Sequence, residues 1–420
     1  MSVRSRYQAG DQSMLRQMNL SAIMNHIRVD SPISRTLLAD TTGLNKATVT
    51  NLVNELIDAR LIREIGLENG ALGRPSMLLS INPQAGYIVS AEIGVNFLTV
   101  IAVDFALNEI TRIDEELDQD TSVDQVWNLL RLSILKVIDA CRQGEYGSLF
   151  GVALGVPGLV DYQTGTLLFA PNLGWRDIPL KNKLQEFIEV PVLVDNEANL
   201  AALGEFYFGA GYQHNDVLYL SAGVGLGGGI IRDGHLFRGE GGMAGEFGHI
   251  TMDPEGELCG CGNRGCWETQ VSLKALNRLV ARSLQESVDS ILLQQINGDS
   301  SKLDISLIVR AAKNGDRLAA DSLNAIGRTL GIGIASCINS LNPGVVVFGG
   351  YMSQAWEFLE PAILKELDSR ALYWSRKNTR VVLARHGKNA CVMGGAAAVH
   401  QAVLANPLAA VNTTVQQLLD

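Results

Sequence analysis

One histidine and three cysteines lie within eighteen residues of this chain, and no other feature constrains its fold as strongly. They are His249, Cys259, Cys261 and Cys266, and glycines lie between the three cysteines. Three thiolates and one imidazole make the closed tetrahedral set that holds a structural Zn²⁺. Glycine lets the backbone turn tightly enough to aim three thiolates at one ion. A glycine-rich loop with free or disulfide-bonded cysteines is the alternative. We predict zinc because three ligands fall within so short a span.

The residues around this set resemble a known signature. Glu246 stands three residues before His249, and Cys259 to Glu268 reads C-G-C-G-N-R-G-C-W-E. This resembles the zinc and sugar motif of the ROK family, which comprises sugar kinases and repressors with an actin-like ATPase fold. The resemblance implies that His249 binds zinc through one ring nitrogen and faces a sugar with the other. It also implies that Glu246 and Glu268 are sugar ligands.

Length and composition indicate a cytoplasmic protein with several globular domains. The 420 residues should form two or three domains, and 47% hydrophobic residues are ample for their cores. No apolar run is long enough for a transmembrane helix, and the N-terminus lacks an apolar signal core, so we expect no membrane contact. Of six cysteines, the three outside the motif are scattered in apolar surroundings, which is typical of cytosolic chains.

The first 80 residues differ from the rest in charge. They carry nine Lys or Arg and seven Asp or Glu, for a net +2, whereas the whole chain carries −10. A mildly basic N-terminal part on an acidic body is typical of a nucleic-acid-binding head. A net +2 is small, so the charge supports this interpretation only together with a motif.

That motif is a pair of short helices. Apolar residues recur at helical spacing over 12–30, and a short helix over 33–41 ends at Thr42-Gly43. A second helix over 45–59 keeps its apolar residues on one face and begins at Asn45, a favourable cap. Two short helices joined by a glycine-containing turn predict a helix-turn-helix.

Two strand-like segments follow and predict a hairpin wing. They are 61–65 and 76–79, separated by the turn Asn69-Gly70. Polar residues at the start of helix 45–59 favour DNA binding over a plain helical dimerisation module, because a recognition helix reads base edges in the major groove. The segment also resembles the head of ROK repressors, which the related sugar kinases lack. The candidate DNA contacts are Arg35, Lys46, Thr48, Asn51 and Arg74.

Residues 82–420 resemble the ROK body nearly throughout. Several predicted strands end in polar or glycine-rich turns, where ligands bind in such sheets. These turns follow residues 88–92, 152–156, 191–194, 216–221 and 345–348. The predicted fold class is α/β, an actin-like two-lobed body with an N-terminal winged helix-turn-helix. We expect the head at 1–80, lobe 1 at 81–195 with the C-terminal helix near 391–406, and lobe 2 with the zinc loop at 196–390.

The body departs from the pattern of a ROK kinase at two points. A kinase carries D-x-G-G-T after the first strand, whereas this chain has Glu92-Ile93-Gly94-Val95-Asn96. It also carries Asn-Asp for its catalytic base, whereas this chain has Asn196-Glu197. A displacement of about 1 Å can reduce a rate about 10²-fold. We therefore expect no kinase activity, although the glycine-rich run 223–229 is intact and leaves residual nucleotide binding possible.

The segments D-N-E-A-N-L-A-A-L-G-E and A-E-I-G-V-N look like those of xylose-responsive ROK repressors. Xylose lacks the C6 hydroxymethyl group of glucose, and the longer Glu197 could fill that volume. We predict a sugar-responsive repressor that senses xylose. It should bind operator DNA as a homodimer or homotetramer. The alternatives are a hexose kinase with a DNA-binding head, or a repressor that senses glucose or an N-acetyl-amino-sugar phosphate. The predicted effector ligands are Asn172, Asn196, Glu197, Glu246, His249 and Glu268.

Overall fold

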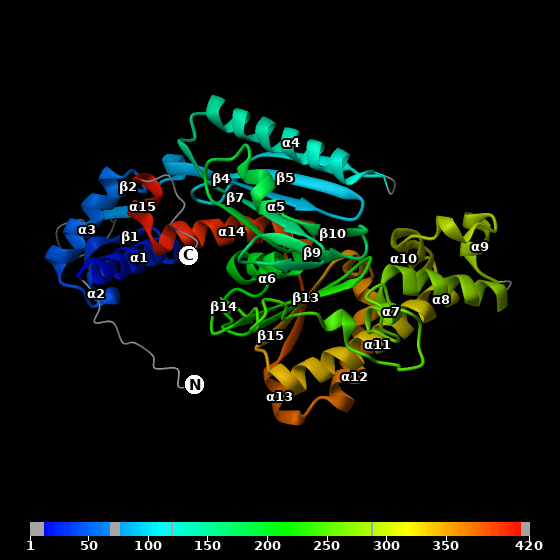
Figure 1. The fold of residues 1–420 in the computed structure, drawn as a ribbon. Helices are drawn as coiled ribbons and strands as arrows, with labels where there is room; N and C mark the ends of the chain where they lie inside the picture. The colour runs from blue at the N-terminus through cyan, green and yellow to red at the C-terminus, as the bar shows by residue number, and fades with distance from the viewer. Residues whose placement is uncertain (1–11, 68–75, 119–120, 287–288, 413–420) are drawn as a thin grey trace, which may run out of the picture.

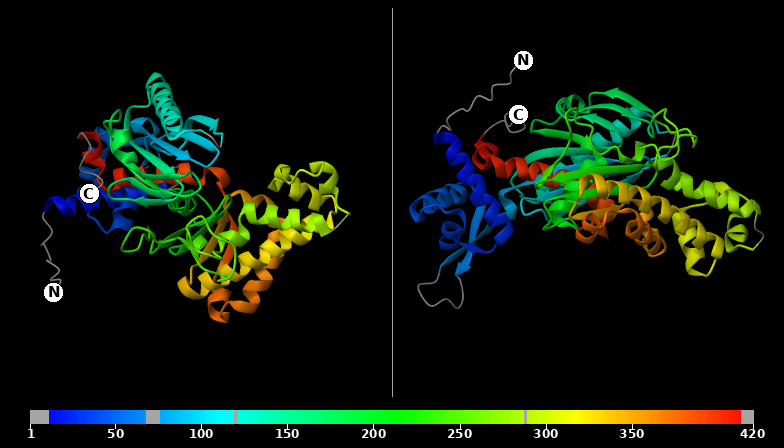
Figure 2. Two further views of the ribbon diagram at one scale, coloured as in Figure 1. Left: turned by 45° about the vertical axis from the view of Figure 1, so that its right-hand side comes forward. Right: turned by 90° about the horizontal axis from the view of Figure 1, so that it is seen from below.

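The computed structural model describes residues 12–67, 76–118, 121–286 and 289–412 (Figure 1). In this part of the chain, two five-stranded sheets form the body, and a three-stranded sheet with three helices forms the head. The head lies at one end of the molecule and the helices α8 to α10 lie at the other (Figure 2). No helix in the described ranges is both long enough and apolar enough to cross a membrane. The predicted domain boundaries stay a prediction.

The head is a helix-turn-helix with a strand hairpin. Its elements are α1 (Gln12–Asp30), β1 (Ile33–Ser34), α2 (Arg35–Thr42), α3 (Lys46–Asp58), β2 (Ile62–Leu67) and β3 (Met77–Ile81). The Ser34 side chain accepts the N–H of Leu37, so the short helix begins two residues later than predicted. Asn45 caps α3 as predicted and accepts the N–H of Thr48. The turn at Asn69-Gly70 lies outside the described residues.

The first helix is longer than its buried face. Ile23 and Ile27 are buried, but Leu15 and Met18, which the sequence pattern places with them, are exposed. The helical period is therefore correct, and the buried face of α1 extends only from Leu20 to Ile27.

The first large sheet has strand order β11-β7-β4-β5-β6. Side chains of β4 alternate between its two faces, so α4 covers one face and α14 covers the other. The elements are η1 (Pro83–Ala85), β4 (Gly86–Ile93), β5 (Phe97–Asp104), β6 (Glu109–Glu116), α4 (Val123–Gln143), β7 (Ser148–Val156) and β11 (Val192–Asn196). A small sheet and a helix stand beside it: β8 (Leu159–Asp161), β9 (Thr166–Ala170), β10 (Trp175–Ile178) and α5 (Leu180–Gln185).

The second large sheet has strand order β14-β13-β12-β15-β16. Its strands are β12 (Val217–Ala222), β13 (Leu226–Arg232), β14 (His235–Leu236), β15 (Val345–Gly349) and β16 (Arg380–Leu383). One face packs on a helical layer comprising α7 (Glu268–Val271), α8 (Leu273–Glu286), α9 (Ile291–Ile296), α10 (Ile305–Lys313), α11 (Arg317–Leu341), α12 (Trp356–Arg370) and α13 (Tyr373–Asn378). This part of the chain also contains four short 3₁₀ turns: η2 (Phe247–His249), η3 (Ser300–Lys302), η4 (Tyr351–Ala355) and η5 (Gly387–Asn389).

The glycine-rich run 223–229 was predicted to be a single turn, but the structure divides it between a turn and a strand. Only Gly223 to Gly225 form the turn, and the next residues enter β13, which pairs with β12. The glycines in the strand serve close packing, since a Cβ on Gly229 would lie 2.6 Å from the Cβ of Ala202. The run is therefore mostly a strand pressed against a helix.

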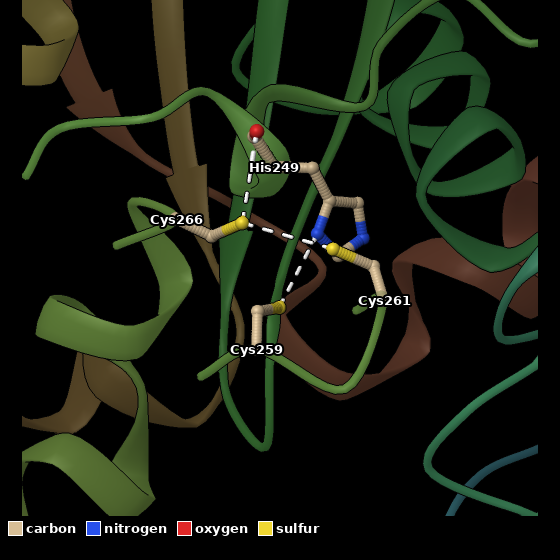
Figure 3. A group of neighbouring side chains, drawn as sticks. All are labelled: His249, Cys259, Cys261 and Cys266. Atoms are coloured by element: carbon tan, nitrogen blue, oxygen red, sulfur yellow. Dashed lines mark hydrogen bonds between the residues drawn. The ribbon is translucent and has the colours of Figure 1, made fainter. Parts of the chain in front are cut away.

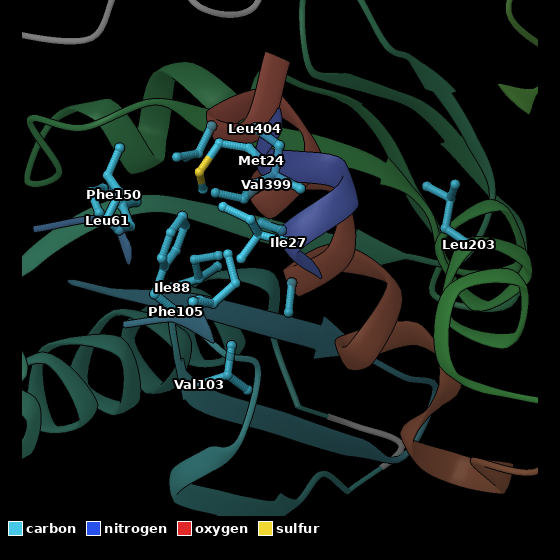
Figure 4. Close-up of a cluster of buried hydrophobic side chains, with 14 of the residues drawn as sticks. Met24, Ile27, Leu61, Ile88, Val103, Phe105, Phe150, Leu203, Val399 and Leu404 are labelled. Carbon is cyan, nitrogen blue, oxygen red and sulfur yellow. The ribbon is translucent and has the colours of Figure 1, made fainter. Parts of the chain in front are cut away.

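Two helices lie between the large sheets and join all parts of the molecule. They are α6 (Glu197–Phe208) and α14 (Ala390–Ala405), and α15 (Pro407–Asn412) follows. Their backbones meet closely, because a Cβ on Gly394 would lie 1.6 Å from the carbonyl oxygen of Leu200. One continuous apolar core runs from Met24 and Ile27 of α1 to Val399 and Leu404 of α14 (Figure 4). The head is thus fused to the body.

Candidate functional site

The predicted zinc ligands converge on one point. The ligand atoms of His249, Cys259, Cys261 and Cys266 lie within 4.8 Å of one another (Figure 3). The Nδ1 atom of His249 is 3.6 Å from the Sγ atom of Cys259, and the Sγ atoms of Cys261 and Cys266 are 3.7 Å apart. Tetrahedral bonds of about 2.3 Å from zinc to sulfur require sulfur atoms about 3.8 Å apart. The four side chains therefore fit one tetrahedral ion, and the three thiols are free.

Glycine makes this arrangement possible at one position above all. Gly265 has φ +62°, and a Cβ there would lie 1.4 Å from the carbonyl oxygen of Asp253. Its own carbonyl oxygen accepts the N–H of Met252 at 2.8 Å, which closes the loop. No side chain fits, so the glycine before Cys266 is a requirement of the loop geometry.

A cavity of about 590 Å³ opens beside the cysteine cluster. Its walls come from the ends of strands in both large sheets and from the loop that carries the cysteines. The six predicted effector ligands all line it: Asn172, Asn196, Glu197, Glu246, His249 and Glu268. The structure thus brings together residues from four separate segments, and their role in binding stays a prediction.

His249 stands between the cysteine cluster and the cavity. Its Nδ1 atom faces the sulfur atoms, while its Nε2 atom lies 3.7 Å from Oε2 of Glu246. Glu268 connects the same two sites, since its Oε1 accepts the Cys259 thiol at 2.9 Å and its Oε2 accepts the N–H of Leu226 at 3.3 Å. A change in the cluster would therefore move two cavity carboxylates.

Asn196 and Glu197 lie where β11 ends and α6 begins. The Asn196 Oδ1 atom caps the helix by accepting the N–H of Ala198 at 2.8 Å. Its Nδ2 atom donates to Oε2 of Glu197 at 2.9 Å and to the carbonyl oxygen of Gly158 at 3.0 Å. Burial, with the nearby carboxylates Glu92 and Glu246 adding to it, raises the pKa of Glu197 to about 8. Glu197 is thus mostly protonated at neutral pH.

Sequence reasoning missed the residues that position Asn196. Asp195 is buried and accepts the N–H of Asn196 at 2.8 Å and the side chain of Asn199 at 3.2 Å. Arg238 lies 2.7 Å from the other oxygen of Asp195 and over the ring of Tyr162 at 3.7 Å. Asp195 is the first residue of the D-N-E motif and could have been found, but Arg238 lies in a loop with no motif of its own.

The turn that replaces the kinase phosphate loop is closed. The N–H of Gly94 donates to the carbonyl oxygen of Phe97 at 2.8 Å, and Val95 lines the cavity. The second glycine turn, at Gly223 to Gly225, lies against a carboxylate. A Cβ on Gly225 would lie 2.7 Å from Oε2 of Glu268. A side chain therefore stands at each of the two turns, that of Val95 in the first and that of Glu268 beside the second.

The candidate DNA contacts are spread over the head. Lys46 and Asn51 are exposed on α3, and Thr48 is half-buried beside them. Arg35 has partners within the head, since its guanidinium donates to Glu64 at 2.8 Å and to Asn54 at 3.3 Å, and its role in DNA binding stays a prediction. The reason is its place at the start of α2, from which the side chain reaches strand β2. Arg74 lies outside the described residues.

This chain is similar in sequence to proteins of one known family. The profile of the ROK family matches residues 88–402. A xylose repressor of Bacillus spizizenii is 35% identical over 384 residues, which cover 91% of this chain and 95% of that protein. A glucokinase of Halalkalibacterium halodurans is 38% identical over 277 residues, which cover 65% of this chain and 84% of that protein.

A solved structure covers the head as well as the body. It is a ROK family transcriptional regulator, a homologue of the E. coli MLC protein, and it matches with a TM-score of 0.83 at 30% identity. The match covers 95% of this chain and 100% of that chain. The predicted fold class, an actin-like α/β body with an N-terminal DNA-binding region, is confirmed. This chain belongs to the ROK family.

Proposed function

We propose that this protein is a transcriptional repressor that binds operator DNA through its head and leaves it when D-xylose enters the cavity. The observation that carries the proposal is the union, in one chain, of a helix-turn-helix and a cavity lined by sugar-type ligands. The similarity to the xylose repressor extends over both parts, whereas the similarity to the glucokinase covers a smaller share of the chain.

The chemistry of the cavity suits a polyhydroxylated ligand. Amide, carboxyl and imidazole groups both donate and accept, so they can bind adjacent hydroxyl groups of one sugar. Glu197 supports the choice of a pentose, because its side chain is one methylene longer than the aspartate of the kinases. We propose that it occupies the volume that the C6 group of glucose would need. If Glu197 replaces the aspartate without changing selectivity, glucose should bind with equal affinity.

The cavity is poorly suited to phosphoryl transfer. A general base must be unprotonated when it accepts a proton from the sugar hydroxyl group. Burial raises the pKa of Glu197 to about 8, so its carboxyl group is mostly protonated at neutral pH. Together with the closed turn at Gly94 and Val95, this supports a sensor rather than a hexose kinase. The alternative is a slow residual sugar kinase activity, which the ADP-release assay described below would detect.

We propose zinc as the ion of the cysteine cluster, held by His249, Cys259, Cys261 and Cys266. When bound, the ion would act as a structural cross-link that fixes the loop. His249 would then keep its Nε2 atom directed into the cavity beside Glu246. The repressor would act in the cytoplasm, and as a homodimer or homotetramer, because two heads are needed to read a palindromic operator.

Two measurements test the proposal. Operator binding should be titrated with D-xylose, D-glucose and N-acetylglucosamine 6-phosphate, and only xylose should weaken it strongly. A coupled ADP-release assay with the same sugars and ATP should stay at background. Turnover in the range of about 1–100 s⁻¹ that is usual for kinases would favour the enzyme instead. Operator release by glucose or by the phosphorylated sugar alone would identify a different effector.

A further inference from the structure

Strand β4 carries two buried oxygen atoms that have no hydrogen-bond partner among the described residues. They are Oγ of Ser90 and Oε2 of Glu92, and they lie two residues apart on the same face of the strand. That face is covered by α14, and the Cys391 thiol of α14 interacts with the Glu92 carboxyl group. Buried polar atoms without partners are rare in folded proteins, so each needs an explanation.

The two oxygen atoms differ in what can reach them. Ser90 is fully enclosed against α14, since a Cβ on Gly395 would lie 2.3 Å from its Oγ atom. Glu92 is 8% exposed and lines the cavity that holds the predicted effector ligands. A ligand in the cavity can therefore reach the side chain of Glu92, whereas it cannot reach Ser90.

The charge of the cavity indicates what that ligand group is. Four carboxyl groups line the cavity, at Glu92, Glu197, Glu246 and Glu268. Among the residues that the structure describes, Lys388 is the one lining residue with a lysine or arginine side chain. A phosphate group would enter a site with little positive charge to balance it. A neutral hydroxyl group can instead accept a hydrogen bond from a protonated carboxyl group or donate one to an ionised group.

We propose that Glu92 is a further effector contact, which binds a hydroxyl group of an unphosphorylated sugar at the β4 side of the cavity. This inference rests on the proposed function and adds a specificity residue to it. Where a ROK kinase carries the aspartate of D-x-G-G-T, this chain offers the longer carboxyl group of Glu92 to a hydroxyl group. Burial raises the pKa of Glu92 to about 8, which supports a neutral, hydrogen-bond-donating group at neutral pH.

Calorimetry on the full chain with D-xylose tests this contact. Glu92→Met removes the hydrogen bond at nearly constant length and should weaken xylose binding about tenfold or more, as expected for loss of one buried hydrogen bond. Glu92→Gln keeps a donor and an acceptor and should stay within about threefold of wild type. Ser90→Ala is the matched control, since it removes the other orphan oxygen of this face and should leave affinity unchanged.

A thermal melt without sugar separates a binding role from a structural role. Glu92→Met removes an unsatisfied buried group, so its melting temperature should not fall, whereas a structural Glu92 would make it fall. Should Glu92→Met fail to fold, Glu92→Asp withdraws the carboxyl group by one methylene and should also lose affinity. Wild-type affinity in whichever of these variants folds would overturn the inference and leave the proposed function standing. Wild-type protein that binds no unphosphorylated sugar would overturn both.

Discussion

Arg28 of α1 lies over the ring of Tyr207 in α6, with its Cζ atom 5.5 Å from the ring centroid. Its Nε atom is buried without a hydrogen-bond partner among the described residues. Helix α6 begins at Glu197 in the cavity and reaches the head at Tyr207. Helix α14 runs beside it, from Cys391 in the cavity to Ala405, whose carbonyl oxygen accepts the side chain of Gln17. The cavity and the head therefore share two packed helices.

We expect Arg28→Met to uncouple sugar binding from DNA binding. A ligand shifts a conformational equilibrium only through contacts that differ between the two states, and Arg28 is a contact between the head and a cavity helix. Xylose affinity and operator affinity without xylose should stay near wild type. The decrease in operator affinity caused by saturating xylose should shrink by at least about fivefold, within the range of typical coupling energies.

The matched control for this variant is Arg131→Met. Arg131 of α4 lies over the ring of Phe187 at 5.6 Å, in similar geometry but away from the head. Its loss should leave the response to xylose unchanged. Full coupling in Arg28→Met, measured by fluorescence anisotropy on labelled operator, would show that the signal passes elsewhere.

Zinc content and xylose binding should be lost together in Cys259→Ser. The Cys259 sulfur contacts both His249 and Glu268, so its replacement removes one metal ligand and a contact to each of two groups of the cavity wall. Elemental analysis should find stoichiometric zinc in wild-type protein and little in the variant, and calorimetry should show weakened xylose binding. Cys141→Ala, which changes a buried cysteine of α4, should keep both properties. Wild-type protein without zinc after purification free of chelators would refute the assignment.

The two exposed residues of α3 should contribute to operator binding in different ways. Lys46→Ala should weaken binding to all DNA sequences, because a lysine there would contact phosphate. The slope of log K against log salt concentration, here called the salt slope, should become shallower by about one. Asn51→Ala should reduce the preference for the operator over other DNA by about 1–3 kcal/mol, as for loss of a base contact. Lys136→Ala on α4 serves as a control for the charge. A salt slope unchanged by Lys46→Ala would remove this residue from the interface.

Stability of the sugar-free protein should fall as the pH rises from about 4.5 to about 8. Burial raises the pKa of Glu92 and of Glu197 to about 8, from 4.5 in an unperturbed glutamate. Between these values the folded state binds more protons than the unfolded state, so stability decreases with pH. Below the range both states are protonated, and above it both are ionised, so the effect levels off.

Urea unfolding at several pH values measures this effect. Glu197→Gln should flatten the decrease, because an amide does not titrate. Glu116→Gln, at an exposed position of β6, should leave the profile as it is in wild type. A wild-type profile with no decrease across this range would contradict the raised pKa values.

Features encoded in short stretches of sequence were predictable. The cap at Asn45 and the cluster of four candidate metal ligands follow from local spacing, and the structure has both. Pairings between distant segments were not predictable. Arg35 meets Glu64 across the head, and Arg238 meets Asp195 across 43 residues, and neither pair leaves a periodic signal.

The glycine-rich run 223–229 shows a different limit. Glycine serves both in turns that bind ligands and in strands pressed against a helix, and composition alone does not separate these uses. Glu92 is similar, since its sequence context suggested only a damaged phosphate loop. Its place in a shared cavity depends on how two sheets are brought together, which no single segment specifies.

The apolar core shared by α1 and α14 has a consequence for chimeric regulators. A head transplanted from a relative would bring its own version of Met24 and Ile27 to a helix shaped for different partners. Excision of residues 1–80 would likewise expose the apolar surface of α14 that packs on α1. Heads of this kind are therefore not interchangeable cassettes. A designer who wants a new operator specificity should graft the exposed surface of α3 alone, or move α1 together with the second half of α14.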